Sequence, residues 1–168
     1  GFQPPTRDAD RPYQAVAHRV STDAGLLMDR ARYLRDGNNA QAARQLAARP
    51  HALTNRPADV GRFYEMLLIL PTGAASDGQW TTAYNIARQV DDALPPGTDL
   101  STQPYDVRDN YTSLTWLAGT TALDALGNPT DAIAMFHRYA NGGRSLQVTT
   151  KGQYLSGPGE VAPPQVGT

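Results

Sequence analysis

The sequence predicts an all-α fold, a superhelical solenoid of antiparallel helix pairs with essentially no β-structure. Three observations predict it. Apolar residues recur at helical spacing along most of the chain, no segment alternates with a period of two, and one kind of turn occurs three times. Helix pairs in a row, each burying its apolar face against its neighbours, are typical of solenoids.

The clearest helix pair is predicted in the run WLAGTTALDALGNPTDAIAMFHRY, residues 116–139. Apolar residues at helical spacing stop at Gly127 and resume beyond Pro129. Gly127 can end the first helix in the left-handed conformation. Asn128 can cap the second helix, and Pro129 suits its first turn. A connection this short requires the two helices to be antiparallel.

Two earlier turns repeat the pattern, with the glycines 41 and 49 residues apart. Each glycine is followed after five residues by alanine and, four residues later, by an apolar residue that fills the gap between the helices. The three sets are Gly37, Ala42 and Leu46; Gly78, Ala83 and Ala87; Gly127, Ala132 and Phe136. The spacing exceeds the roughly 34 residues of tetratricopeptide repeats and approaches that of HEAT repeats.

In chain order, we expect a flexible polar arm over 1–11, the helical domain over 12–156 and a disordered tail over 157–168. Helices are predicted at 12–20, 23–36, 39–48, 57–70, 80–90, 104–126, 129–140 and 146–155. Asn38, with Gln41 three residues on, resembles a capping box for the third of these. Pro71 is expected to end or kink the fourth. The proline-containing connections at 50–57 and 93–104 should be irregular.

Composition excludes several classes of function. The net charge is −1, so nothing in it attracts nucleic acid or an acidic membrane. The chain has no cysteine, which excludes disulfides, thiol nucleophiles and zinc–thiolate sites. No apolar run approaches the about 20 residues that span a bilayer, so no membrane span is expected. Residues 1–12 also lack the basic and apolar regions of a signal peptide.

The sequence predicts no catalytic, metal-binding or cofactor-binding residue. His18, His51 and His137 are far apart and match no metal-ligand spacing. No nucleophile elbow, phosphate-binding loop or dinucleotide fingerprint occurs. Asp91 and Asp92 are adjacent, so their side chains point about 100° apart in a helix and cannot share a proton. We expect them to be solvated charges at a helix end.

Aromatic residues are the remaining candidates for a binding role. Placed along a concave face, they could stack on sugar rings, although aromatics at helical spacing are more often core. The candidates for glycan stacking are Trp80, Tyr84, Tyr105 and Tyr111. Trp116 and Phe136 are expected in the core. Arginines are numerous, but aspartates are interleaved with them, which favours a mixed, solvated surface.

Four runs resemble the α-superhelical region of soluble lytic murein transglycosylases. They are LLMDRARYLRDGNNAQAARQLAARP, RPADVGRFYEMLL, DGQWTTAYNIARQVDDALPPGTD and RDNYTSLTWLAGTTALDALGNPTDAIAMFHRYANGGRSLQVTTKGQY. Together they lie within residues 25–155, most of the chain. The most specific pieces are Trp-Leu-Ala-Gly at 116–119 and Leu-Gly-x-Pro-x-x-Ala at 126–132.

The resemblance implies a noncatalytic scaffold. Members are bacterial periplasmic lyases whose helical region frames a peptidoglycan glycan strand for a separate, lysozyme-like catalytic domain. That domain uses the glutamate of a Glu-Ser motif as acid and then base. Here Glu65 precedes Met66 and Glu160 precedes Val161, so neither matches the motif. We therefore expect no catalytic domain, no cofactor and no glycosidic cleavage by this chain alone.

Two stretches depart from the family pattern, Pro71-Thr72-Gly73 and residues 155–168, where a helix would be expected to continue. They leave open whether the chain is a fragment, a remnant without its catalytic part or a partly misread sequence. The expected partners are peptidoglycan glycan strands and either a catalytic domain or another protein, in the periplasm. The alternative function is a tetratricopeptide-like module that binds a peptide.

Overall fold

The structure is a computed structural model that describes residues 15–142, and the described residues are helical with no strand. Residues 15–22 form the first helix of the described chain. The elements are α2 (Ala24–Asp36), α3 (Ala40–Ala48), α4 (Val60–Ser76), α5 (Trp80–Ala87), η1 (Val90–Ala93), η2 (Leu100–Thr102), α6 (Tyr105–Thr120), the π-helical η3 (Thr121–Ala125) and α7 (Pro129–Gly142). None of the described helices is long and apolar enough to cross a membrane.

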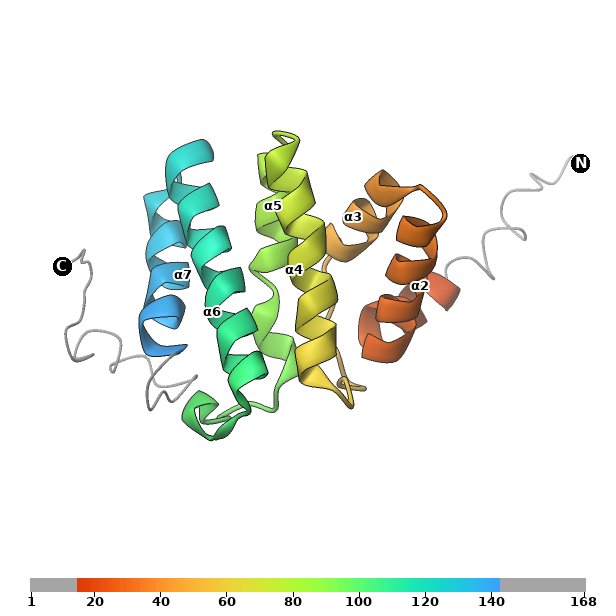
Figure 1. The fold of residues 1–168 in the computed structure, drawn as a ribbon, viewed down its shortest axis with the longest axis horizontal. Coiled ribbons are helices and arrows are strands. Elements are labelled where there is room, and N and C mark those ends of the chain that lie inside the picture. The colour runs from red at the N-terminus through yellow and green to blue at the C-terminus, as the bar shows by residue number, and fades with distance from the viewer. Residues whose placement is uncertain (1–14, 143–168) are drawn as a thin grey trace, which may run out of the picture.

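The helices form three pairs, α2/α3, α4/α5 and α6/α7, which lie side by side in chain order (Figure 1). The first helices of the pairs contact one another, since α4 packs against both α2 and α6. Among the second helices, α5 packs against α3. The predicted all-helical fold of paired helices is therefore confirmed. The superhelical path remains a prediction. The expected arm 1–11, helix 146–155 and tail 157–168 lie outside the described residues.

Two of the three predicted turns have the expected geometry, and the first is shifted by one residue. Gly78 and Gly127 adopt positive φ angles of 76° and 61°. At the first turn Gly37 has φ −83°, and Asn38 takes the left-handed conformation with φ 61°. Asparagine tolerates this region better than most residues because its short polar side chain bonds locally. The prediction that Gly37 is the equivalent residue was wrong.

The shift carries through the helix that follows. Asn39, not Asn38, caps α3, and its side chain accepts a hydrogen bond from the Ala42 amide at 3.2 Å. The buried small residue is accordingly Ala43 rather than Ala42, which is only half-buried. The equivalent alanines of the other two pairs are buried as predicted, Ala83 and Ala132. In all three pairs an alanine five positions after the left-handed residue lets the paired helices approach closely.

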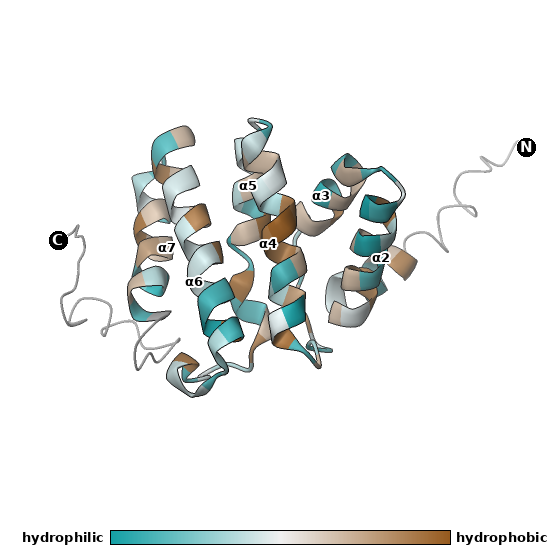
Figure 2. Ribbon diagram, viewed as in Figure 1, coloured by the Kyte–Doolittle hydropathy of each residue, from teal (hydrophilic) through white to brown (hydrophobic). Residues whose placement is uncertain are grey.

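Helix α4 is the centre of the core. It contains the most hydrophobic segment of the described chain (Figure 2), and its predicted inward residues, Phe63, Met66, Leu67 and Leu70, are buried. The helix does not end at Pro71 but continues to Ser76 with this proline buried in its interior. Because proline has no N–H, the Leu67 carbonyl lacks its helical donor. Burial of the ring among the neighbouring helices offsets part of that loss.

Irregular connections are held by backbone hydrogen bonds. The predicted loop after α3 runs beside the start of α2, where the Asn55 carbonyl accepts from the Ala24 amide at 2.9 Å. The amides of Ala52 and Thr54 donate to the carbonyls of Ser21 and Thr22 at 2.9 and 3.0 Å. Asp23 caps α2 by accepting from the Leu26 amide at 3.1 Å. The loop before α4 is therefore anchored on the first pair.

The α6/α7 pair depends on Gly119. A Cβ at this position would lie 2.6 Å from the Phe136 ring. We predict that Gly119→Ala lowers the free energy of unfolding by about 1–3 kcal/mol, the usual cost of overpacking a core. Urea denaturation followed by circular dichroism measures it. The double variant Gly119→Ala with Phe136→Leu should recover part of the loss. A more stable single variant would contradict the close approach, because alanine otherwise favours helix over glycine.

Candidate functional site

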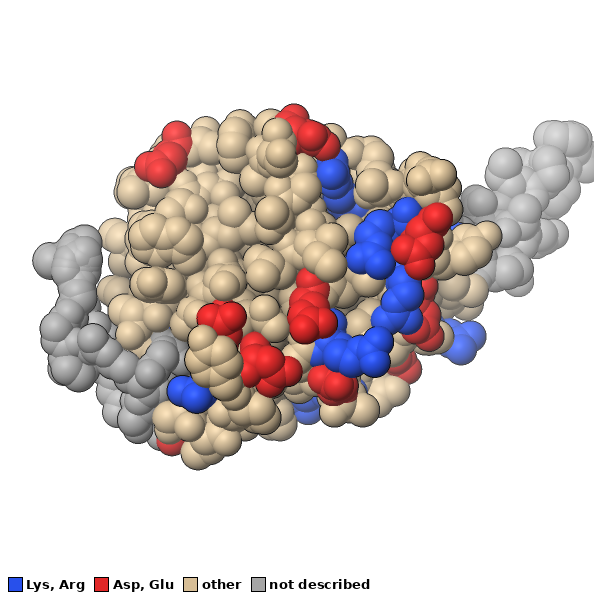
Figure 3. All heavy atoms as spheres, in the orientation of Figure 1, with Lys and Arg blue, Asp and Glu red and all other residues tan. Residues whose placement is uncertain are grey.

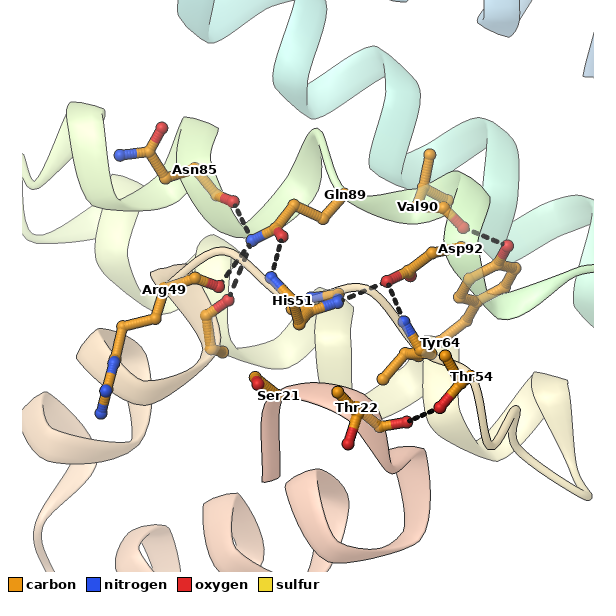
Figure 4. A network of polar contacts seen from close by, with 12 residues as sticks. Ser21, Thr22, Arg49, His51, Thr54, Tyr64, Asn85, Gln89, Val90 and Asp92 are labelled. Atoms are coloured by element: carbon orange, nitrogen blue, oxygen red, sulfur yellow. Dashed lines mark hydrogen bonds and ion pairs between the residues drawn. The ribbon is translucent and has the colours of Figure 1, made fainter. Parts of the chain in front are cut away.

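The densest polar network in the described chain surrounds η1, the short helix after α5 (Figure 4). Its two aspartates point to different neighbours. Asp92 contacts the loop between the first and second pairs, where one carboxylate oxygen lies 2.6 Å from His51 Nδ1 and 3.2 Å from the Leu53 amide. The His51 side chain is 2% exposed and that of Asp92 24%. Asp92 thus holds the loop between the first and second pairs through partly buried hydrogen bonds.

Gln89, one turn ahead of the aspartates, strengthens the same junction. Its side-chain oxygen accepts from the His51 amide at 2.9 Å. Its nitrogen lies within hydrogen-bonding distance of the carbonyls of Ala47, Arg49 and Asn85, at 3.4, 3.1 and 2.9 Å. The first two of these carbonyls are at the C-terminal end of α3, where helical carbonyls have no partner within the helix. A side chain of the second pair therefore caps a helix of the first.

Asp91 connects the second pair to the third. Its carboxylate accepts from the Tyr111 hydroxyl of α6 at 2.8 Å and from Arg138 Nε of α7 at 2.7 Å. On the other side of η1, the Tyr64 hydroxyl of α4 donates to the Val90 carbonyl at 2.7 Å. Both tyrosine side chains are fully buried. The backbone and side chains of η1 are thus bonded to elements of both adjacent pairs.

The network affects the acidity of the two buried tyrosines. Burial, which disfavours a phenolate, is the main cause that raises the pKa of Tyr64 and of Tyr111 well above its ordinary value. The negative charge of Asp91 raises both further, and its hydrogen bond to Tyr111 does the same by stabilising the neutral phenol. Both phenols therefore stay neutral donors throughout the physiological range.

The expectation that Asp91 and Asp92 are solvated helix-end charges was wrong. Their side chains are only 35% and 24% exposed, and both carboxylates are paired. The two carboxylates do point apart, as expected of adjacent residues, and they bind different partners. One signal in the sequence pointed to the contact with His51. His51 and Asp92 are 41 residues apart, close to the 40 residues between the left-handed Asn38 and Gly78, so they lie in corresponding stretches after the second helices of consecutive pairs.

A histidine paired with a carboxylate is a familiar general base, and in this pair one further atom of each side chain is buried. The reactive nitrogen, Nε2 of His51, is buried and has no hydrogen-bond partner among the described residues, and neither does Oδ1 of Asp92. The arrangement ties chain segments together, at the cost of two unpaired buried atoms.

The residues predicted for glycan stacking lie on two helices, Trp80 and Tyr84 on α5 and Tyr105 and Tyr111 on α6, and they differ in exposure. Tyr111 is fully buried, so its ring cannot meet a sugar and this assignment was wrong. Tyr84 is half-buried with the Arg88 guanidinium 5.9 Å from its ring centre. Trp80 and Tyr105 are 43% and 73% exposed, and they begin different helices, α5 and α6. They remain open to a ligand.

Trp116, which was expected in the core, belongs to an aromatic cluster at the surface. Trp116 is 50% exposed, and its ring centre lies 5.5 Å from that of Phe136 and 4.9 Å from that of Tyr139. Phe136 is half-buried, and Tyr139 is exposed. The prediction of a core position was therefore wrong for Trp116. Helical periodicity identified the face correctly but could not tell whether another element covers it.

Charged side chains are unevenly spread. On the face shown in Figure 3, basic side chains gather over α2 and α3 with acidic ones among them. Ion pairs account for part of this mixture: Arg32 with Asp29, Arg35 with Asp36, and Arg44 with Asp77. The expected mixed surface is found there. Much of the same face over α6 and α7 is free of charged side chains.

We predict that Asp92→Ala destabilises the fold by about 1–3 kcal/mol, because it leaves the His51 ring and the Leu53 amide buried without an acceptor. Asp124→Ala is the matched control, since it removes an exposed aspartate from η3. Thermal unfolding followed by circular dichroism compares the two. Equal melting temperatures would show that the Asp92 contacts contribute nothing net.

Alkaline pH should destabilise the protein through its buried tyrosines. Above the ordinary pKa of 10.0, tyrosines of the unfolded chain lose protons while Tyr64 and Tyr111 keep theirs in the fold. The free energy of unfolding should then fall by about 1.4 kcal/mol per pH unit for each of them. Urea titrations between pH 9 and 11 measure this slope. Tyr111→Phe should make it shallower, whereas Tyr33→Phe, at an exposed site, should leave it unchanged.

The described residues contain no group of three or more His, Cys, Asp or Glu side chains that could hold a metal ion. Glu65 is exposed on α4, and Glu160 lies outside the described residues. Comparison of the chain with models of known families, with curated proteins and with solved structures finds no match.

Proposed function

We propose that this chain is a noncatalytic helical scaffold of a bacterial peptidoglycan lytic transglycosylase. It frames or binds glycan strands in the periplasm while a separate domain cleaves them. The helix pairs continue one another along a superhelical path, so that the row offers an extended face to a polymeric ligand. The chain itself contributes no catalytic group to the cleavage.

One observation carries this proposal: the residues with the most specific resemblance shape the α6/α7 pair. In the Trp-Leu-Ala-Gly run, Ala118 is fully buried and Gly119 lies directly under the Phe136 ring. In the Leu-Gly-x-Pro-x-x-Ala turn, Gly127 has φ 61° and Ala132 is buried. Asn128 caps α7 by accepting from the Asp131 amide at 3.1 Å. These residues therefore meet packing requirements of the α6/α7 pair, as expected of a structural unit in a scaffold.

The alternative is a tetratricopeptide-like module that binds a peptide. The same row of helix pairs supports it, since stacked pairs commonly present an extended surface to a segment of another protein. The two proposals differ in the ligand, because a glycan strand offers sugar faces and hydroxyls to exposed aromatic side chains. Trp80 and Tyr105 are the predicted stacking residues that remain accessible.

Purified peptidoglycan sacculi test the scaffold proposal. We predict that the chain sediments with sacculi, that soluble glycan fragments release it, and that Trp80→Ala with Tyr105→Ala weakens retention. Tyr33→Ala is the control, because it removes an exposed aromatic side chain that is not among the candidates. No retention, together with binding to a defined peptide, would favour the alternative. Release of muropeptides by the chain alone would contradict a noncatalytic role.

A further inference from the structure

The last helix pair has an exposed apolar surface in the part of the chain that the structure describes, and we call it the outer face. It consists of Trp116 of α6, Leu123 of η3, and Ile133, Phe136 and Tyr139 of α7. Four of these residues are 41–54% exposed, and Phe136 is half-buried with its ring centre 5.5 Å from that of Trp116. Trp116 lies on the opposite side of α6 from the buried Leu114, so the face points away from the core.

The aromatic part of the outer face is held in place from below. A Cβ on Gly119 would lie 2.6 Å from the Phe136 ring, so this ring rests directly on the α6 backbone. The Trp116 ring packs on Phe136 and also on Tyr139, whose ring centre is 4.9 Å away. Side chains that are already ordered lose little conformational entropy when a partner covers them. A rigid aromatic patch of this kind is typical of the centre of a protein interface.

The outer face presents no charge that a partner would have to desolvate. Residues 110–123, which include most of α6 and the start of η3, contain no charged residue. The two charged residues of α7 are directed to the rest of the row. Arg138 Nε donates to Asp91 at 2.7 Å, and the Asp131 carboxylate lies beside the Tyr84 hydroxyl of α5. Apolar contact with the outer face therefore leaves these charges where they are.

The two ends of the row differ in chemistry, and this difference decides how two copies can meet. The α2/α3 pair at the other end carries exposed charged side chains of both signs, among them Asp29, Arg30 and Asp36 (Figures 1 and 3). Head-to-tail stacking would press the apolar end of one copy onto these charges and remove their water without pairing them. Contact between two outer faces instead buries apolar side chains of both copies. A two-fold axis brings one patch onto its own copy, and an uncharged patch is complementary to itself.

We propose that two copies of this chain associate through their outer faces about a two-fold axis. The area of the face sets the strength of this contact. The face is two helices wide, about 20 Å, and roughly 21–24 Å long, the length of the 14 residues of α7 and the 16 of α6. The resulting area of about 450 Å² falls short of the roughly 800 Å² per partner of a standard interface. The dimer should therefore be weak, with a dissociation constant on the order of 10–1,000 µM.

Sedimentation velocity of the full chain over a range of concentrations tests the proposal. The mass should rise from one copy of 18.1 kDa towards two copies and no further. Leu123→Glu with Ile133→Glu should raise the dissociation constant about tenfold or more, because it buries unpaired charges in the contact. Ile69→Glu should leave it unchanged, and it is a matched control because Ile69 is 51% exposed on α4 and Ile133 is 54% exposed on α7. Circular dichroism melting of dilute samples checks that the variants keep the fold.

The fluorescence of Trp116 reports on the same face. Trp80→Phe makes Trp116 the sole tryptophan, because the chain has two. Acrylamide should quench Trp116 strongly in dilute protein and less as the dimer forms. A two-fold contact covers Trp116 in both copies, so the loss of quenching should follow the dimer fraction measured by sedimentation.

Four results would overturn the proposal. A monomer at about 1 mM with Trp116 open to acrylamide would show a free face. A monomer in which Trp116 is protected at every concentration would show that the chain itself covers the face. Oligomers that grow beyond two copies would show head-to-tail stacking, and protection that develops only with soluble glycan fragments would make the face a ligand site. The inference does not rest on the proposed glycan function, so either can fail without the other.

Discussion

Asp91 and Asp92 connect all three helix pairs, because their carboxylates leave one short helix in different directions. Asp92 fixes the loop that follows the first pair, and Asp91 holds Tyr111 and Arg138 of the third. Partly buried pairs of this kind gain little net free energy over an apolar contact, since desolvation offsets attraction. These contacts matter because any arrangement that breaks them leaves a buried donor without its acceptor, which costs free energy. That cost selects one arrangement of the pairs over alternatives of similar hydrophobic burial.

Much of the fold could be predicted from the sequence because its signals are local. Helical periodicity, the caps at Asp23 and Asn128 and the left-handed turns at Gly78 and Gly127 act within a few residues. The first turn was misplaced by one residue, because Gly37 followed by Asn38 offers two residues able to adopt a positive φ. Pro71 was expected to end or kink its helix, and the first of these alternatives was wrong because α4 continues to Ser76. The rule that proline breaks a helix applies to an isolated helix. In α4, packing around the buried Pro71 ring keeps the helix continuous.

The polar network and the surface aromatics were less predictable because they depend on contacts between distant segments. Gln89 forms hydrogen bonds with residues about forty positions away, and no local sequence pattern predicts these contacts. For Trp116, the helical face was predictable but its exposure to solvent was not. A periodic pattern gives the direction of a side chain, whereas its burial depends on whether another element lies there. Sequence reasoning thus located the faces of the helices but not their partners.

The side chain of Gln89 has a consequence for how the protein unfolds. A row of independent units would fray from its ends, each pair separating at its own temperature. Here the final carbonyls of α3 depend on an amide from the neighbouring pair, so the first pair loses its cap whenever the second opens. Because a helix end in one pair is capped by a side chain of the next pair, the pairs are coupled. This coupling favours a single, all-or-none unfolding transition over stepwise melting.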